Sequence, residues 1–476
     1  MHFSIGRRSA LKRAGAAGLW LLAPGCGKNE PVVDPKPAAG DFADGALRLD
    51  LRQRLAEGAE DFTLERVRFE RTWPGRRDRL ADGPGWGDYR LSVYLQDREA
   101  PLFRHGFDTS LAPHARSATA QLSVRFPTPQ RPVRATIEKR RGESAFQAVS
   151  TFAIDPAGDT IDRAAAATAA RVDTLLQNGE PRAKADLAIL GDGYRESEYS
   201  RFAGDAARAA GYLFSVEPFK ARQRDFNVRA VFTPSAESGV TDPYLGLRKE
   251  TAFRCAYGSA AAERTLAAED GGAVREAATA APYDFLLVLA HARRYGGSAY
   301  FGGPAVVAID SAAARYLVVH ELAHAMAGLA DEYYLPAGDG PAYRGNIEPW
   351  QANATLAPER GKWRDLLSGP PRPTPWNKTE YERRFADYVR RYDRLRASGA
   401  DEGVVEKLMQ DERGRQAALL ARGGEARQAG YFEGANGYAK GMYRSGADCI
   451  MFSLQSDYFC PACTAALNLA IDEQCR

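Results

Sequence analysis

The chain has 476 residues, of which 45% are hydrophobic and 26% charged, so it is long enough for two or three domains with proper cores. Its formal net charge of +3 is nearly balanced for this length, and nothing in it suggests a nucleic-acid partner. After the N-terminal segment, no apolar run is long enough to predict a membrane helix.

The first 26 residues have the layout of an export signal. Two paired arginines, Arg7 and Arg8, lie in a basic start, an apolar stretch runs from Ala14 to Ala23, and Cys26 follows a Pro-Gly pair. The apolar stretch is too short for a stable anchor, and the paired arginines resemble the twin-arginine class of signals. Cys26 fits either a lipoprotein cleavage box, which would attach a lipid, or an ordinary cleavage site near a lone cysteine. We therefore expect an exported protein that is periplasmic, at the cell surface, or an outer-membrane lipoprotein.

The next two segments predict a tether and a β-rich domain. Residues 27–44 contain three prolines and no apolar periodicity, which is typical of a tether. From about residue 45 to 155, apolar and polar residues alternate, as in Tyr89–Leu95, between turn-forming residues. This pattern predicts an N-terminal antiparallel β-sandwich with an accessory role. His105 and His114 lie near the expected turns without ligand spacing, and we interpret them as surface or structural residues.

A second domain, about residues 180–476, is expected to be of the α/β type, which makes the whole chain α+β. An Ala-rich segment from Arg163 to Leu176 predicts a connecting helix. A strand expected from Tyr300 to Ile309 could pair with an extended substrate if it lies at a sheet edge. His291 is interpreted as a loop residue. The other expected elements form a strand–helix–strand layer: strands at 185–190, 226–232 and 283–289, and a helix at about 197–214.

The motif His320-Glu321-Leu322-Ala323-His324 follows a short apolar run on a helix expected to begin near Asp310 or Ser311. Residues four apart lie on one helix face, so both imidazoles can reach one metal ion. Glu321, between them, can address a metal-bound water as a general base. An amphipathic helix that carries these residues by chance is the alternative.

A catalytic zinc site needs three protein ligands and one open position. No histidine occurs after His324, so the third ligand is a carboxylate or an upstream histidine. Gly328 can end the helix and turn the chain back, which favours Asp331 as third ligand. Glu332 and, further on, Glu348 are the alternatives. Asp331 and Glu332 could instead hold the histidines in place by hydrogen bonds.

The C-terminal part of the chain predicts a helical insertion and a cysteine-rich tail. Residues of about 379–427 are rich in Arg, Glu, Ala and Leu at helical spacing, and we give this insertion no catalytic role. In an exported protein the tail cysteines are expected to form disulfides, although a structural zinc site is an alternative. Cys255 has no obvious partner. The tail cysteines are Cys449, Cys460, Cys463 and Cys475.

The extended motif His-Glu-x-x-His-x-x-x-Gly-Leu-x-Asp-Glu-Tyr, from His320 to Tyr333, resembles the signature of the bacterial IgA peptidase family of zinc metallopeptidases. The similarity spans about residues 185 to 475, and residues 45 to 155 resemble the β-rich domain that often precedes the peptidase domain in that family. Further similar segments are Gly191–Tyr194, Phe226–Val228, Glu433–Ala435, Gly441–Arg444, Cys449–Met451 and Phe459–Cys463.

The resemblance implies a metzincin-like zinc endopeptidase that acts on protein or peptide substrates. Zn²⁺ would be held by His320, His324 and Asp331, and Met451 would form the methionine turn beneath the metal. Gly328 falls one residue later than in the metzincin pattern. The candidates for a tyrosine that donates to the oxyanion are Tyr333, Tyr443 and Tyr458.

Two other functions stay open at this point. One is a non-catalytic surface binding protein on a zincin scaffold. The other is a zincin-like hydrolase of non-peptide substrates. An intact Glu321 between intact histidines favours a peptidase, because a binding protein has no need of the base. The sequence predicts no oligomeric state.

Overall fold

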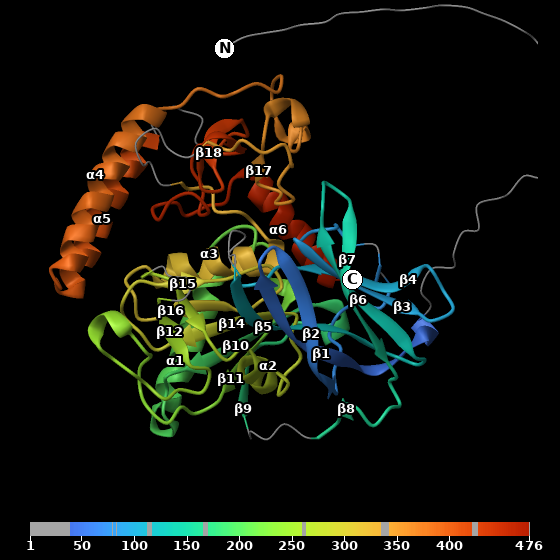
Figure 1. The fold of residues 1–476 in the computed structure, drawn as a ribbon. Coiled ribbons are helices and arrows are strands. Elements are labelled where there is room, and N and C mark those ends of the chain that lie inside the picture. Colours follow the sequence, from blue (N-terminus) through green and yellow to red (C-terminus); the bar gives the residue numbers. More distant parts are fainter. Residues whose placement is uncertain are drawn as a thin grey trace, which may run out of the picture. The chain divides into compact units, whose positions relative to one another are not determined.

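The computed structural model describes residues 39–78, 80–81, 83–111, 117–164, 170–258, 263–334, 342–420 and 427–475. The expected export signal, with its paired arginines and Cys26, lies outside the described residues, as do most of the expected tether and His114. The described part of the chain has a mixed α+β structure with several sheets (Figure 1).

The N-terminal region forms two four-stranded sheets, with the strand orders β5-β1-β2-β8 and β4-β3-β6-β7. All strand pairs are antiparallel except β2 with β8. The predicted alternation places apolar side chains of both sheets, such as Leu49 and Ile137, in one hydrophobic core. The strands are β1 (Phe42–Ala56), β2 (Ala59–Glu70), β3 (Tyr89–Leu95), β4 (Pro101–Phe107), β5 (Ser117–Pro129), β6 (Val133–Arg140), β7 (Phe146–Ile154) and β8 (Ile161–Asp162).

A six-stranded mixed sheet follows, with the order β15-β16-β14-β10-β11-β9. Its four central strands run parallel, and the two outer strands are antiparallel to their neighbours. Every residue of β10 is buried, which is why this strand has a continuous apolar pattern rather than an alternating one. The strands are β9 (Arg171–Leu176), β10 (Ala185–Asp192), β11 (Phe226–Phe232), β14 (Phe285–Ala290), β15 (Gly297–Ser298) and β16 (Ala305–Ala308).

Two sequence predictions at the borders of this sheet are wrong. Residues 171–176, expected to be helical, form the edge strand β9, because backbone pairing with β11 overrides the local helix preference. The strand expected from Tyr300 to Ile309 is only β16, and it lies inside the sheet between β14 and β15. Gly297 of β15 in turn forms a bridge to Thr265, so β16 presents no free edge for a substrate.

Helix α3 (Ala314–Ala327) carries the His-Glu-x-x-His motif and packs against β14 and β16 of the sheet and against α1 and α6. The helix begins at Ala314, a few residues after Asp310 and Ser311, at which the sequence predicted its start. Ser311 instead caps a turn before the helix, because its hydroxyl accepts the N–H of Ala313. Twelve of its fourteen residues are buried, so the helix is apolar on nearly every face apart from the motif. The other helices around the sheet are α1 (Tyr199–Leu213) and α2 (Gly271–Ala278), and α6 (Pro461–Gln474) ends the described chain.

The predicted helical insertion is a pair of helices that lie side by side in Figure 1. None of the helices in the described part of the chain is long and apolar enough to cross a membrane. The remaining elements are two small sheets, β12 with β13 and β17-β19-β18. Their bounds, with those of the helix pair, are α4 (Lys378–Ala397), α5 (Glu402–Leu420), β12 (Cys255–Tyr257), β13 (Leu266–Ala268), β17 (Ala354–Thr355), β18 (Phe432–Ala435) and β19 (Tyr438–Arg444).

A buried charge network joins the N-terminal sheets to helix α2. The guanidinium of Arg48, which has no exposed surface, lies 2.8 Å from Asp50, 3.0 Å from Glu70 and 3.1 Å from Glu276 of α2. Removing one member of such a network leaves uncompensated buried charge. The network therefore links strands β1 and β2 to helix α2 through specific side chains.

Replacing Arg48 by alanine should lower the free energy of unfolding by about 3–5 kcal/mol, because the buried carboxylate of Glu70 would lose one of its two guanidinium partners and keep only Arg125. The matched control is Arg54→Ala in the same strand, whose pair with Asp61 is exposed on both sides and should cost about 0–1 kcal/mol. Urea unfolding curves measure both. Equal midpoints for the two variants would show that the network does not stabilise the fold.

Candidate metal centre

The three residues of the motif lie where helix α3 approaches its C-terminal end. Gly328 ends the helix in a left-handed conformation with φ 56°, and its N–H donates to the carbonyl of His324 at 2.9 Å. A side chain at this position would also collide with Trp350, since a Cβ atom would lie 2.1 Å from that ring. The predicted helix end is confirmed, and the chain turns back to bring Asp331 beside the histidines.

His320, His324 and Asp331 direct three ligand atoms toward one point. The two Nε2 atoms are 3.0 Å apart, and Oδ1 of Asp331 lies 3.1 Å from His320 Nε2 and 3.2 Å from His324 Nε2. Zinc binds nitrogen and oxygen at about 2.0–2.2 Å in a tetrahedron, which separates such ligands by roughly 3.3–3.6 Å. The observed triangle is slightly tighter, so the three residues fit one ion of this size.

Both imidazoles are oriented through their other nitrogen. Nδ1 of His320 contacts the carbonyl of Ile450 at 3.0 Å, and Nδ1 of His324 contacts the carbonyl of Leu329 at 2.5 Å. A backbone carbonyl can only accept, so each Nδ1 carries the proton and each Nε2 keeps a lone pair for a metal.

The electrostatics of the group keep Asp331 ionised. Although burial opposes the change, the two imidazoles hold the pKa of Asp331 well below its usual range. Burial likewise opposes protonation of His324, but the Asp331 carboxylate raises the pKa of His324 to about 9. Burial raises the pKa of Glu321 above the ordinary glutamate value. In the metal-free protein, a proton on His324 balances the charge of the Asp331 carboxylate. A metal ion that binds here therefore replaces that proton.

The alternative third ligands lie elsewhere. Glu332 is fully buried and points to a group of cysteines, where its Oε1 lies 3.2 Å from the sulfurs of Cys460 and Cys463. Glu348 accepts the N–H of Leu356 at 3.1 Å and lies 3.4 Å from Lys362. Among the carboxylates that the sequence offered, Asp331 alone joins the two histidines.

A cavity of about 660 Å³ opens over the motif. Gly297 of β15 lines it beside Glu321, and a Cβ on that glycine would lie 2.8 Å from the Glu321 carboxylate. Helices α4 and α5 form another wall, with an aromatic row on α4: Tyr381, Phe385, Tyr388 and Tyr392. The insertion is therefore part of the site, which its solvated composition did not predict.

Tyrosines surround the histidines. Of the three oxyanion candidates, Tyr333 lines the cavity, whereas Tyr443 lies in β19 opposite Glu433, and Tyr458 lies under the guanidinium of Arg427. Tyr316 was missed, although it precedes His320 by one helical turn and its ring stacks on that imidazole at 4.8 Å.

Two further residues that line the cavity belong to no sequence motif. Tyr295 and Arg264 reach the cavity from loops, which no spacing in the sequence could indicate.

The other predicted histidines do not join the centre. His291 follows β14, stacks on Tyr194 at 4.7 Å and contacts the carbonyl of Gly193 at 3.0 Å, as expected for a loop residue. His105 lies in strand β4 rather than near a turn, and it stacks on Phe103 and Phe301.

The prediction of disulfides is wrong for the described cysteines, all of which are free and buried. Cys255 lies in β12. Cys475 lies at the end of α6, where its sulfur contacts the carbonyl of Asp225 at 3.5 Å. The remaining three, Cys449, Cys460 and Cys463, gather around Glu332.

Met451 lies in a tight turn directly after Ile450, whose carbonyl contacts His320. The N–H groups of Phe452 and Ser453 both donate to the carbonyl of Cys449, at 2.8 Å and 2.9 Å. Met451 itself is fully buried, and its carbonyl accepts the N–H of Glu332 at 2.8 Å. The turn is thus tied to the histidine and to the loop that carries Asp331.

The fold and the site together define a class: a mixed α+β protein whose cavity carries the His-Glu-x-x-His motif of zinc peptidases beside an aspartate. Residues 174–471 match the family model described as IgA Peptidase M64, and residues 40–151 match the model described as Peptidase M64 N-terminus. The chain belongs to the IgA peptidase M64 family. A search of the curated proteins gives no significant match. The family is one of peptidases, which implies protein or peptide substrates.

Proposed function

We propose that this protein is an exported zinc endopeptidase in which His320, His324 and Asp331 hold the metal. The observation that carries the proposal is the convergence of their three ligand atoms within 3.2 Å of one another at the cavity. When bound there, zinc supplies a Lewis acid that polarises a carbonyl and lowers the pKa of a coordinated water to about 7.

Glu321 is the proposed general base. Its buried carboxylate accepts the proton of the attacking water and passes it to the nitrogen of the leaving amine. Burial raises the pKa of Glu321, which brings its proton affinity closer to that needed at neutral pH. Tyr333, which lines the cavity, is the proposed donor of a hydrogen bond to the developing oxyanion.

The position of Met451 supports a metzincin-like arrangement. Its turn supplies the Ile450 carbonyl that orients His320. We further propose that the two N-terminal four-stranded sheets form an accessory β-sandwich, for which their shared core is the support. The proposed division of the chain is residues 45–155 for this domain and residues 180–476 for the peptidase domain.

Export is proposed from residues 1–26 alone, with a lipid on Cys26 as the form that would attach the protein to a membrane. Mass spectrometry of the mature N-terminus in the native host tests both steps. A chain that begins at Cys26 with a lipid mass supports both, a start nearby without lipid supports export only, and an intact Arg7-Arg8 segment contradicts both.

The zinc concentration that restores activity after chelation should depend steeply on pH. A proton on His324 competes with the metal, and the pKa of His324 in the metal-free protein is about 9. Lowering the pH from 9 to 7 should therefore weaken zinc binding by about 50-fold, and the weakening should approach tenfold for each pH unit below the pKa of His324. The measurement is recovery of peptidase activity in zinc buffers after chelation, normalised at each pH to the fully loaded enzyme. A half-recovery concentration that does not change with pH would contradict the proposed ligand set.

A further inference from the structure

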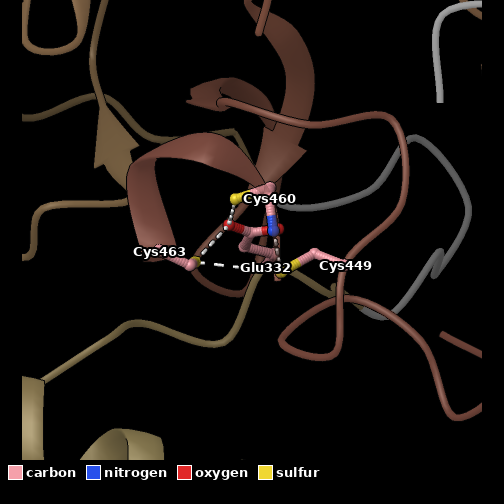
Figure 2. A group of neighbouring side chains, drawn as sticks. All are labelled: Glu332, Cys449, Cys460 and Cys463. Atoms are coloured by element: carbon pink, nitrogen blue, oxygen red, sulfur yellow. Dashed lines mark hydrogen bonds between the residues drawn. The ribbon is translucent and has the colours of Figure 1, made fainter. Parts of the chain in front are cut away.

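A second group of metal-ligand side chains lies beneath the loop that carries Asp331. Glu332, Cys449, Cys460 and Cys463 come from three separate segments, and none of them has any exposed surface. Figure 2 shows their side chains converging, with Oε1 of Glu332 between the sulfurs of Cys460 and Cys463 at 3.2 Å from each. Sγ of Cys449 lies 3.8 Å from Sγ of Cys463.

We propose that these four residues bind a structural zinc ion. Zinc holds thiolate sulfur at about 2.3 Å and carboxylate oxygen at about 2.0–2.2 Å. In a tetrahedron these bond lengths separate two sulfurs by about 3.8 Å, and a sulfur from an oxygen by roughly 3.5 Å. The observed distances match the first value and approach the second, and four protein ligands complete the closed shell of a structural site.

The charge of Glu332 supports a cation at this point. Its Oε2 atom is buried and has no hydrogen-bond partner among the described residues. Nδ2 of Asn353 donates to Oε1 of Glu332 at 3.1 Å, but this neutral amide does not balance the charge of a buried carboxylate. A nearby guanidinium does not bond to it either. That group, on Arg444, donates instead to the carbonyls of Gly434 and Ala447. A bound cation would balance the negative charge of the Glu332 carboxylate.

The surroundings of the sulfurs suit thiolates. The N–H groups of Cys460 and Met451 donate to Sγ of Cys449 at 3.2 Å and 3.4 Å, and the hydroxyl of Ser445 donates to Sγ of Cys460 at 3.0 Å. Cys460 and Cys463 lie at the start of helix α6, where free N–H groups favour negative charge.

A redox disulfide is the competing use of the Cys-Pro-Ala-Cys segment at residues 460–463. Catalytic and redox-sensing thiols need access to a partner and are partially exposed, whereas these sulfurs are fully buried. A disulfide would also leave the third thiol and the Glu332 carboxylate without a role. Zinc uses all four groups.

The position of the ion gives it a consequence for the histidine site, and this part rests on the proposed function. Glu332 directly follows Asp331, and Cys449 directly precedes Ile450, whose carbonyl orients His320. Zinc at the cysteine cluster would hold both segments in place. It would act as a positioning element for the first ion and would not touch the substrate.

Metal analysis of the full chain tests the inference. We expect two zinc ions per chain in the wild type and one in His320→Ala/His324→Ala. Zinc X-ray absorption of that double variant should show three sulfurs at about 2.3 Å and one oxygen at about 2.0–2.2 Å. Cobalt substitution of the same variant should give sulfur-to-cobalt charge-transfer absorption, whereas Glu332→Gln should lose zinc from the cluster.

The outcomes separate the two sites. A single zinc ion in the wild type with sulfur ligands would contradict the histidine site and support the cluster. A single ion with nitrogen ligands and no sulfur would overturn the cluster, as would a disulfide between any two of Cys449, Cys460 and Cys463 found by mass spectrometry of the alkylated wild type. Neither wild-type result depends on whether a variant folds.

Discussion

Replacing Glu321 by glutamine should lower the kcat of peptide hydrolysis by about 10²- to 10⁴-fold, the usual contribution of a general base. Glutamine keeps the size of the side chain, which fits against Gly297, but it cannot accept the proton of the attacking water. Zinc at the His320–His324 pair should stay bound, because Glu321 is not one of the three converging ligands. The measurement is kcat and zinc content on the same preparation.

The matched control is Glu196→Gln, an exposed glutamate in a short helical turn far along the chain from the motif. It should leave kcat unchanged. Full activity in Glu321→Gln would remove Glu321 from the mechanism. Loss of both activity and zinc would instead make Glu321 a determinant of metal binding.

Replacing Asp331 by asparagine should lower activity by more than about 100-fold at limiting zinc. Loss of a group that merely supports a metal ligand costs 10- to 100-fold, and loss of a ligand itself should cost more. Without its carboxylate the site would keep two neutral imidazoles and lose the negative charge that attracts the cation. Zinc affinity, measured by competition with a chelator, and kcat/KM report the effect.

Glu348→Gln is the control for this second substitution. That carboxylate was an alternative third ligand from the sequence, but it contacts Lys362 and the N–H of Leu356 instead. Its replacement should leave zinc affinity at the histidine pair unchanged. If Asp331→Asn retains wild-type affinity and activity, another group is the third ligand.

The sequence predicts the parts of this fold in which pattern and burial agree. Strand β11 has the predicted bounds, and β10 and α1 agree to within two residues, because continuous apolar runs and helical periodicity report burial directly. The sequence favours a position of Asp331 beside His324, since a glycine after a helix reverses the chain, but it leaves Glu332 and Glu348 as alternatives.

Long-range pairing decides the parts that sequence patterns miss. Residues 171–176 are a strand because β11 offers them an edge, which no local pattern reports. The contact of Glu332 with the cysteines was missed for a similar reason. Glu332 neighbours Asp331, but Cys460 and Cys463 lie more than one hundred residues later in the chain. The wall that α4 and α5 contribute to the cavity likewise depends on tertiary packing.

The most direct test of the central claim is hydrolysis of a peptide library in water enriched in oxygen-18, followed by mass spectrometry. We expect the zinc-loaded protein to produce new carboxyl termini that each carry one oxygen from the solvent, and the chelated protein to produce none until zinc is restored. No cleavage by the zinc-loaded protein, or equal cleavage with and without zinc, would contradict the account.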